Sequence, residues 1–321
     1  MLIDFVKIIK FRFYYLKFIV IFVRLSNFDF VTKNLKQMQI TITNDDLSAT
    51  IDSKGAELIS LIKKKSAENY IWEGSVAFWA KHSPVLFPIV GTLKDNFYLY
   101  DNNKYILSRH GFARDCNFEI VNKSYNEVVF SLSSNEKTKK QFPFEFELQI
   151  KYLLTKFELK ISYLVINKDT ISIPFSLGAH PAFSLKSKIE NYSLQFENQE
   201  SLSCFILENG LISDTNYTIE LIEKKMPLTY SLFEKDALIF KKIQSKKITL
   251  FENEIPKLNI LFNDFKNLGL WTVQNARFIC IEPWLGYSDT INHNNQLIEK
   301  EGIEFVQENC IFNCKLSIEI L

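Results

Sequence analysis

Alternating apolar and polar residues recur in short runs along most of the chain and predict β-strands. The first clear run begins at Met38 and reads Met-Gln-Ile-Thr-Ile-Thr-Asn, so its apolar side chains would share one face of a strand. Later runs either alternate in the same way or are rich in β-branched and aromatic residues. They are Ala49–Ile51, Glu57–Ile62, Glu127–Leu132, Phe144–Leu153, Phe157–Ile166, Ile171–Leu177, Lys247–Phe251 and Phe278–Ile281.

Turn-forming clusters such as Asn-Asp-Asp, Asp-Asn-Asn and Glu-Asn-Gly separate these runs. Successive runs often lie about ten residues apart, which is typical of β-sandwiches. No long amphipathic helix competes, and one short helix is predicted at Ser134–Lys140. We therefore predict an all-β fold, a large antiparallel β-sandwich with few short helices. The nine glycines form neither GxGxxG nor GxxxxGK, so nothing supports nucleotide binding.

Residues 1–37 differ from the rest of the chain and are predicted to be an N-terminal extension outside the fold. They hold seven basic residues and two acidic ones, among many Phe, Ile, Val and Tyr. The uncharged run Phe18–Val23 is far shorter than the roughly 20 apolar residues of a membrane span, and no small-residue cleavage site of a signal peptide follows it. Residues 38–321 are then predicted to form a single β-sandwich domain.

One alternative for this segment stays open. Lys10, Lys17 and Arg24 are spaced by seven residues, so a helix would place them on one stripe. A basic amphipathic helix lying on a membrane surface would have this pattern.

Composition excludes several classes of protein. The 321 residues carry a net charge of +1, which gives no electrostatic footprint for nucleic acid. With 23% charged and 14% aromatic residues the chain is not of the disordered type. The five cysteines are odd in number and include no CxxC pair, so we expect free core thiols and a reducing, cytoplasmic compartment. They are Cys116, Cys204, Cys280, Cys310 and Cys314.

Three polar segments interrupt the β pattern. The first is Phe87–Asp95, followed at some distance by Ser108–Arg114; the second is Ser176–Ser184; and the third is Cys280–Asp289. Each places a titratable residue beside Gly or Pro in apolar surroundings. Such placement suggests strand ends or rigid loops, where side chains can be fixed in a cleft.

The residues placed in this way beside Gly or Pro are His110, His180 and Glu282. A lone histidine among apolar residues is more often a core residue than a functional one. Glu282 is less ordinary, because carboxylates are rarely buried without a partner. An ion pair with Arg109 or Arg114 is the plain structural explanation, and acid–base chemistry is the functional one.

Other chemistries have weaker support in the sequence. No histidine lies within four residues of another, so we predict no metal site. The GxSxG turn of many serine hydrolases is absent. His82 and His293 are expected to be exposed or incidental.

Taken together, the polar segments resemble the aldose 1-epimerase (galactose mutarotase) family, and most closely its LacX-like branch. The order and spacing of the motifs match from about Met38 to Leu321. The motifs are Arg-His-Gly-Phe-Ala-Arg at Arg109–Arg114, Leu-Gly-Ala-His-Pro-Ala-Phe at Leu177–Phe183 and Ile-Glu-Pro-Trp at Ile281–Trp284. Further matching stretches are Phe78–Trp79, Leu86–Gly91 and Leu268–Thr272.

The resemblance implies a galactose mutarotase-like supersandwich with a sugar groove across one sheet. It implies interconversion of the α and β anomers of a free aldose, without metal or cofactor. Glu282 would be the base that takes the O1 proton, and His180 the acid that protonates the ring oxygen. His110 would hydrogen-bond the same region of the sugar. The expected partner is a small sugar, with no nucleic acid, and the protein is expected to be a monomer or small homo-oligomer.

The resemblance and the residue types also suggest substrate-binding residues. They are Arg114, Arg109, Asp236, Trp271, Lys94 and Trp284, with Phe183 as a further candidate for stacking on a sugar. One departure is Thr92, which stands where many relatives carry an arginine that binds sugar hydroxyls. Two alternatives therefore stay open: a sugar-binding protein that has lost catalysis, and a relative that acts on a sugar phosphate.

Overall fold

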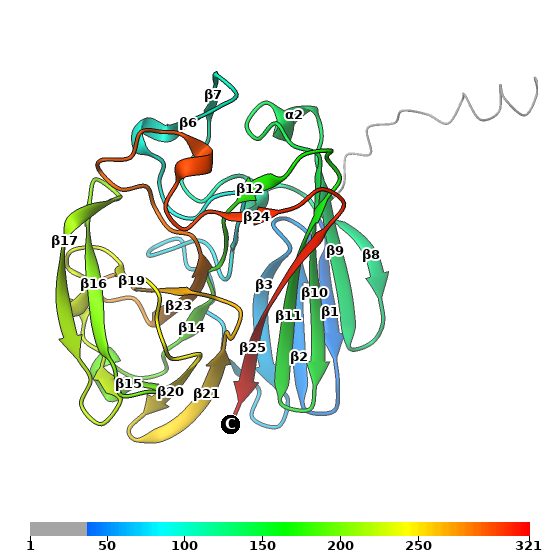
Figure 1. Cartoon of the computed structure of the whole chain (residues 1–321). Helices are drawn as coiled ribbons and strands as arrows, with labels where there is room; N and C mark the ends of the chain where they lie inside the picture. Colours follow the sequence, from blue (N-terminus) through cyan, green and yellow to red (C-terminus); the bar gives the residue numbers. More distant parts are fainter. Residues whose placement is uncertain (1–36) are drawn as a thin grey trace, which may run out of the picture. The chain divides into compact units, whose positions relative to one another are not determined.

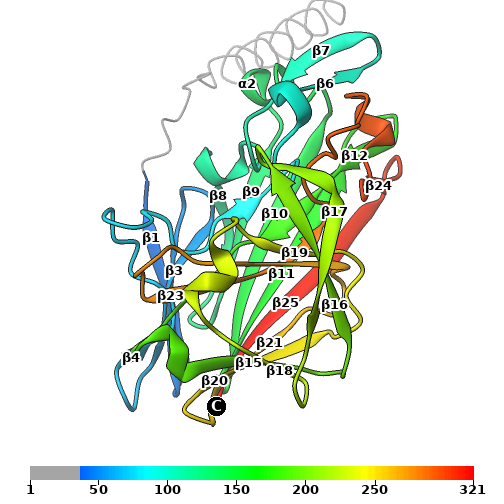
Figure 2. The ribbon, with the colours of Figure 1, turned by 90° about the vertical axis from the view of Figure 1, so that its left-hand side faces the viewer.

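The structure, a computed structural model, describes residues 37–321. Most of these residues lie in antiparallel strands, and the strand ladders form two large sheets and three small ones. The predicted all-β antiparallel fold is therefore confirmed. In Figure 1, β16 and β17 of one large sheet lie at the left, and β10, β11 and β25 of the other lie at the right. Figure 2, turned by 90°, places the first pair in front of β11 and β25, so the two sheets form separate layers.

The nine-stranded sheet has the order β18-β15-β20-β21-β25-β11-β10-β9-β8. Its strands are β8 (Glu119–Lys123), β9 (Glu127–Ser133), β10 (Phe146–Thr155), β11 (Glu158–Asn167), β15 (Tyr192–Phe196), β18 (Lys225–Pro227), β20 (Lys247–Glu252), β21 (Ile255–Leu261) and β25 (Ile311–Ile320). Along β10 every second side chain is buried, as the alternating sequence predicts.

The eight-stranded sheet has the order β17-β16-β19-β22-β23-β13-β5, with β14 also paired to β23. Its strands are β5 (Val85–Leu86), β13 (Leu177–Ala179), β14 (Ala182–Ser184), β16 (Ser201–Glu208), β17 (Leu211–Glu220), β19 (Leu238–Phe240), β22 (Asn267–Trp271) and β23 (Phe278–Leu285). This sheet carries the candidate site described below.

The remaining elements are short. The small sheets are β1 (Gln39–Thr43), β2 (Leu47–Asp52), β3 (Glu57–Lys63) and β4 (Glu68–Asn69); β6 (Phe97–Tyr100) and β7 (Asn103–Ile106); and β12 (Ile173–Phe175) and β24 (Glu304–Val306). The helices are α2 (Glu136–Lys139) and the 3-10 turns η1 (Lys94–Asn96), η2 (Ala113–Asp115), η3 (Ile189–Asn191), η4 (Tyr230–Phe233) and η5 (Leu297–Glu299). The predicted short helix is α2. It begins after Asn135, whose side chain accepts hydrogen bonds from the backbone N–H groups of Lys137 and Thr138.

Strand β23 is buried along its whole length, because it lies inside the eight-stranded sheet and both of its faces are covered. Ile279, Ile281 and Leu285 pack into the main core, which draws side chains from both large sheets. The alternate residues face the other side, where Cys280 and Trp284 belong to two smaller apolar clusters. Glu282 therefore stands on this second face, between the two clusters.

The predicted N-terminal extension lies outside the described residues, apart from Gln37, and so does the basic stripe that contains Lys10. Among residues 37–321 no helix has both the length and the apolar character needed to span a bilayer. All five cysteines are free, as expected. Cys310 is exposed, however, and Cys116 is half-buried, so not all of the thiols belong to the core.

A buried ion pair fixes the chain that follows β23. The Nζ atom of Lys300 lies 2.6 Å from Oδ1 of Asp289, and both side chains are almost fully buried. The other carboxylate oxygen of Asp289 accepts a hydrogen bond from the backbone N–H of Lys94. His293 approaches the same carboxylate at 3.9 Å, and its side chain is 9% exposed. Of the two alternatives expected for His293, exposed or incidental, the first was therefore wrong. Burial also lowers the pKa of His293.

Replacing Lys300 by Met should destabilise the protein strongly. The change would leave the Asp289 carboxylate buried without its countercharge, and such a loss typically costs about 3–5 kcal/mol. Urea denaturation at neutral pH would measure the free energy of unfolding. Lys266→Met is the matched control, because Lys266 is exposed in its pair with Glu304, and exposed pairs contribute roughly 0–1 kcal/mol. Equal effects of the two substitutions would contradict the prediction.

Candidate active site

A groove on the second face of β23 gathers the residues singled out in the sequence. It has a volume of about 280 Å³, near the lower end of the roughly 300–1,000 Å³ of small-molecule sites, so it suits a small ligand. Its lining includes all of the predicted catalytic and substrate-binding residues except Lys94 and the further candidate Phe183. These lining residues are His110, His180, Glu282, Arg109, Arg114, Asp236, Trp271 and Trp284, and they are joined by Trp79 and Ala237.

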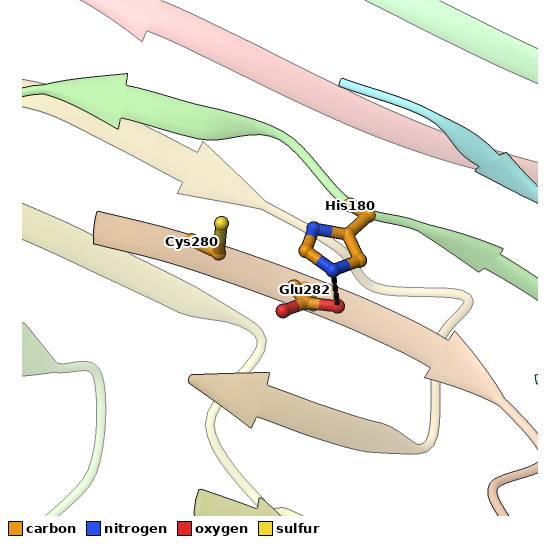
Figure 3. A group of neighbouring side chains, drawn as sticks. All are labelled: His180, Cys280 and Glu282. Carbon is orange, nitrogen blue, oxygen red and sulfur yellow. Dashed lines mark ion pairs between the residues drawn. The ribbon is translucent and has the colours of Figure 1, made fainter. Parts of the chain in front are cut away.

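Strand register brings His180 to Glu282. Gly178 of β13 pairs with Trp284, and Ala182 of β14 pairs with Cys280, so the intervening His180 lies opposite Glu282. The Nε2 atom of His180 is 3.2 Å from Oε2 of Glu282. Figure 3 shows the imidazole directed at the carboxylate. Neither predicted arginine partner lies within ion-pair distance of Glu282 in residues 37–321; the partner is His180.

Two glycines make room for Trp284 beside this pair. A Cβ atom at Gly269, on the neighbouring strand β22, would lie 2.5 Å from the indole ring of Trp284. A Cβ atom at Gly178, on the strand to the other side, would lie 2.7 Å from the same ring. Glycine at both positions therefore lets the indole lie against the sheet, next to the carboxylate that it helps to cover.

His110 is held by a pair of hydrogen bonds to Gly91. The backbone N–H of Gly91 donates to Nδ1 of His110 at 3.1 Å, and the backbone N–H of His110 donates to the carbonyl of Gly91 at 2.8 Å. A backbone amide can only donate, so Nδ1 is an acceptor and the hydrogen of a neutral ring sits on Nε2. Burial, together with His180, lowers the pKa of His110 well below its usual value, which keeps the ring neutral.

The exposed side chain of Arg109 lies against the same ring, with Nε 3.2 Å from Nε2 of His110. A neutral imidazole cannot accept from both Gly91 and Arg109. The Gly91 amide is fixed in the backbone, whereas Arg109 is free to move. The Nε2–H group of His110 is therefore available to donate a hydrogen bond to a ligand oxygen.

Burial governs the protonation of the central pair. It raises the pKa of Glu282 well above its usual value, although Arg109 opposes this shift. It also lowers the pKa of His180 to about 3. Both shifts disfavour charge, so the pair favours a neutral carboxylic acid beside a neutral imidazole, with one proton between them.

Several buried polar atoms at the site have no hydrogen-bond partner within the described chain. They include Nδ1 of His180, Oε2 of Glu282 and Nε1 of Trp284. The indole lowers the pKa of Glu282 a little, but it makes no hydrogen bond of standard geometry with the carboxylate. Buried polar groups are normally paired, so these atoms are suited to a polar ligand with several hydroxyl groups.

Aromatic rings surround His180. Trp79 stacks on it, with ring centroids 4.9 Å apart, and Trp271 meets it edge-on at 6.0 Å. In the sequence Phe78–Trp79 is marked only by the family resemblance, and no role is predicted for Trp79. That matching stretch was the signal that could have identified it. Phe183, in contrast, is fully buried in the main core and does not line the groove.

Three charged residues besides Glu282 line the groove: Arg109, Arg114 and Asp236. The Nη2 atom of Arg114 donates to the carbonyl of Arg109 at 2.7 Å, which ties the two arginines together. Asp236 has a left-handed backbone conformation, with φ of 86°, and its carboxylate accepts a hydrogen bond from the following N–H. Arg114 belongs to η2 and Asp236 lies between η4 and β19, and both residues line the groove.

Lys94 does not join this group. Its Nζ atom donates to the carbonyl of His293, away from the groove, because its backbone is anchored to Asp289. Thr92, which stands where many relatives have arginine, also lies outside the lining. His82 is half-buried, with Nδ1 2.8 Å from the carbonyl of Trp72, so it is incidental to the groove but not exposed.

One set of side chains within residues 37–321 has a metal-ligating arrangement. His180, Cys280 and Glu282 each offer a ligand atom, and these atoms lie within 4.8 Å of one another. The spacing of the histidines in the sequence does not point to this set, because two of its members, Cys280 and Glu282, are a cysteine and a glutamate two residues apart on one strand.

Comparisons with known proteins agree with the resemblance seen in the sequence. The family model for aldose 1-epimerase matches residues 38–300. The plasmid protein LacX of Lactococcus lactis subsp. lactis is 33% identical over 281 residues, which cover 83% of this chain and 94% of LacX.

Solved structures agree as well. A galactose mutarotase-like protein from Lactobacillus casei is 31% identical, with a TM-score of 0.82, over 88% of this chain and all of that protein. A galactose mutarotase related enzyme from Lactobacillus acidophilus is 28% identical, with a TM-score of 0.84, over 88% of this chain and 97% of that one.

Glu282→Gln should stabilise the fold, and more so at higher pH. Because the folded pKa of Glu282 is raised above its ordinary 4.5, the free energy of unfolding that this group contributes falls as pH rises from about 4.5 toward the folded pKa. Gln has no proton to lose. Urea denaturation of chelator-treated protein should therefore show a larger gain from Glu282→Gln at pH 8 than at pH 5. An equal or smaller gain at pH 8 would contradict the assigned shift.

Proposed function

The chain belongs to the aldose 1-epimerase family, and on that premise we propose that it interconverts the α and β anomers of a free aldose by opening and reclosing the sugar ring. Family membership gives the chain a function of the sugar epimerase or mutarotase type. The observation that carries the finer proposal is the contact of His180 with Glu282 at 3.2 Å, in a groove that His110 also lines.

The chemistry needs one base and one acid that lie close together. In a cyclic aldose, O1 and the ring oxygen are both bonded to C1, so two adjacent groups can reach both atoms. Glu282 takes the proton of the O1 hydroxyl while His180 gives a proton to the ring oxygen. The bond between C1 and the ring oxygen breaks, and C1 and O1 form a carbonyl. Rotation about C1–C2 and reclosure with the roles reversed give the other anomer.

The pair holds one exchangeable proton before and after ring opening, but not the same one. Before ring opening it is on His180 and the carboxylate is charged. Ring opening gives that proton to the ring oxygen, and the proton from O1 then sits on Glu282. Burial favours the second, neutral arrangement. Hydroxyl groups of the sugar that donate to Glu282 would favour the first. Oε2 of Glu282 is buried and makes no hydrogen bond of standard geometry within the described chain, which leaves it able to accept one from the bound sugar.

The other residues of the groove are given supporting roles. The Nε2–H group of His110 would donate to a sugar oxygen as charge develops on it, displacing Arg109 from that position. Trp79 and Trp271 offer apolar surface for the C–H face of the sugar. Asp236 and the two arginines are left to bind the remaining hydroxyl groups.

An anionic sugar is a second candidate substrate, and Arg109 is the reason. Its guanidinium lines the groove, is exposed, and has no carboxylate within 4.0 Å in the part of the chain that the structure describes. Guanidinium groups suit phosphate and carboxylate. A panel of free aldoses, aldose phosphates and uronic acids would separate the two classes. Faster turnover of the anionic sugars, reduced selectively by Arg109→Met, would favour this alternative.

Polarimetry on freshly dissolved α-glucose and α-galactose tests the main proposal. We expect mutarotation faster than in buffer, and Glu282→Gln or His180→Asn should each lower kcat/KM about 10²–10⁴-fold, since positioned acid–base groups contribute that much. Lys94→Met is the control and should retain near wild-type turnover, because Lys94 lies outside the groove.

Three outcomes of these experiments would contradict the proposed activity or part of it. No acceleration with any aldose, free or anionic, at high protein concentration would overturn the proposed activity. Saturable sugar binding by calorimetry in that case would favour a binding protein that lacks catalysis. Wild-type rates in a folded Glu282 or His180 variant would remove the role of that residue alone.

A further inference from the structure

A thiol lies beside the acid–base pair and has no part in the proposed reaction. Cys280 is two residues before Glu282 on β23, so both side chains point to the same face of the sheet. Its cross-strand partner Ala182 is two residues from His180. Figure 3 shows the thiol, the imidazole and the carboxylate grouped above one segment of β23. All three side chains belong to buried residues, and Cys280 is fully buried.

We propose that His180, Cys280 and Glu282 bind one thiophilic divalent cation, of the Zn²⁺ type, and that the bound cation blocks the acid–base pair. Thiolate, imidazole and carboxylate are the three kinds of side-chain ligand that Zn²⁺ takes. A thiolate among them selects zinc-like ions over Mg²⁺ and Ca²⁺, which prefer oxygen.

The spacing of the donors suits a tetrahedral ion. Bonds of about 2.0–2.3 Å from such an ion hold its ligand atoms roughly 3.3–3.6 Å apart. His180 and Glu282 already stand at 3.2 Å, and the whole set lies within 4.8 Å, so the thiol needs a shift of about 1 Å. Side-chain rotation can supply a shift of that size.

The hydrogen bonding of the ligands supports the same conclusion independently. Nδ1 of His180 and Oε2 of Glu282 are buried and make no hydrogen bond of standard geometry within residues 37–321; the contact of Oε2 is the one with Nε2 of His180 at 3.2 Å. A cation bound between Nε2 and Oε2 would therefore replace only this contact. His180 and Glu282 also line the groove, so a fourth coordination position would open toward it, as in zinc sites that keep a place for a small molecule.

Two parts of the inference rest on different grounds. Cation binding depends only on the three ligands. Inhibition rests on the proposed function, because it requires that His180 and Glu282 exchange protons with the sugar. A cation that takes lone pairs of both residues leaves neither free for that exchange, so cation and sugar should compete.

Metal binding to the chelator-stripped full chain tests the site directly. Calorimetry should find one equivalent of Zn²⁺, with release of protons from the ligands. Co²⁺ in its place should give a thiolate-to-cobalt charge-transfer band. Cys280→Ser keeps nearly the same side-chain volume and should weaken Zn²⁺ binding more than about 100-fold, since loss of outer-shell partners alone costs about 10–100-fold. The cobalt band should disappear.

A matched control is Cys310→Ser. Cys310 is the exposed thiol of the described chain and the other obvious ligand for a soft cation. Its removal should leave the buried-site affinity and the cobalt band unchanged. Glu282→Gln retains every thiol and should weaken Zn²⁺ binding by a factor similar to that of Cys280→Ser. If Cys280→Ser does not fold, the Zn²⁺ affinity of Glu282→Gln tests the cation site instead.

Activity separates this proposal from the preceding one. Mutarotation that Zn²⁺ inhibits in the wild type but not in Cys280→Ser would support both. A cobalt–thiolate band that depends on Cys280, in a protein without mutarotation, would support the cation site and overturn the proposed function. Wild-type Zn²⁺ affinity in Cys280→Ser or in Glu282→Gln would overturn the cation site, whatever the activity.

Discussion

The removal of the Glu282 carboxylate from water is the constraint on which the rest of the site depends. Glu282 is 1% exposed and stands on a strand whose two faces are both covered. A charged carboxylate without a partner would be very costly there. His180 at 3.2 Å gives the proton a second place to reside, so the pair can hold or lose charge without either group being isolated. This is the property that acid–base catalysis on a neutral sugar requires.

The fold enforces this constraint through strand register rather than through loops. β23 lies between β22 on one side and β13 with β14 on the other, and each neighbour contributes one feature of the site. Gly269 and Gly178 leave room for Trp284, and the two-residue link between β13 and β14 presents His180. Just after β23, the Asp289–Lys300 pair ties the returning chain to the backbone of Lys94. A shift of β23 by one residue relative to its neighbouring strands would move Glu282 to the opposite face of the sheet.

Most of what the sequence predicted came from the order of apolar and polar residues within short segments. Alternation located strands such as β10 and β11, and an isolated polar residue in an apolar run singled out Glu282. Contacts between distant segments had no such signature. No residue near His180 in the sequence indicates that its ring contacts Glu282. An ion pair with an arginine would have explained the buried Glu282 equally well. Lys94 was misplaced for the same reason: its backbone hydrogen bond to Asp289, far along the chain, turns the side chain away from the groove.

The exclusion of water that suits proton transfer also determines which cations the site could bind. Burial disfavours each charged form by itself, but a cation that enters with two anionic ligands and a neutral imidazole forms a neutral cluster. To bind it, the site must give up the shared proton and the thiol proton, so cation affinity rises with pH. Proton transfer to the sugar needs that shared proton to stay. The two proposed uses would draw on the same lone pairs and would therefore exclude each other, and Cys280 would take part in cation binding alone.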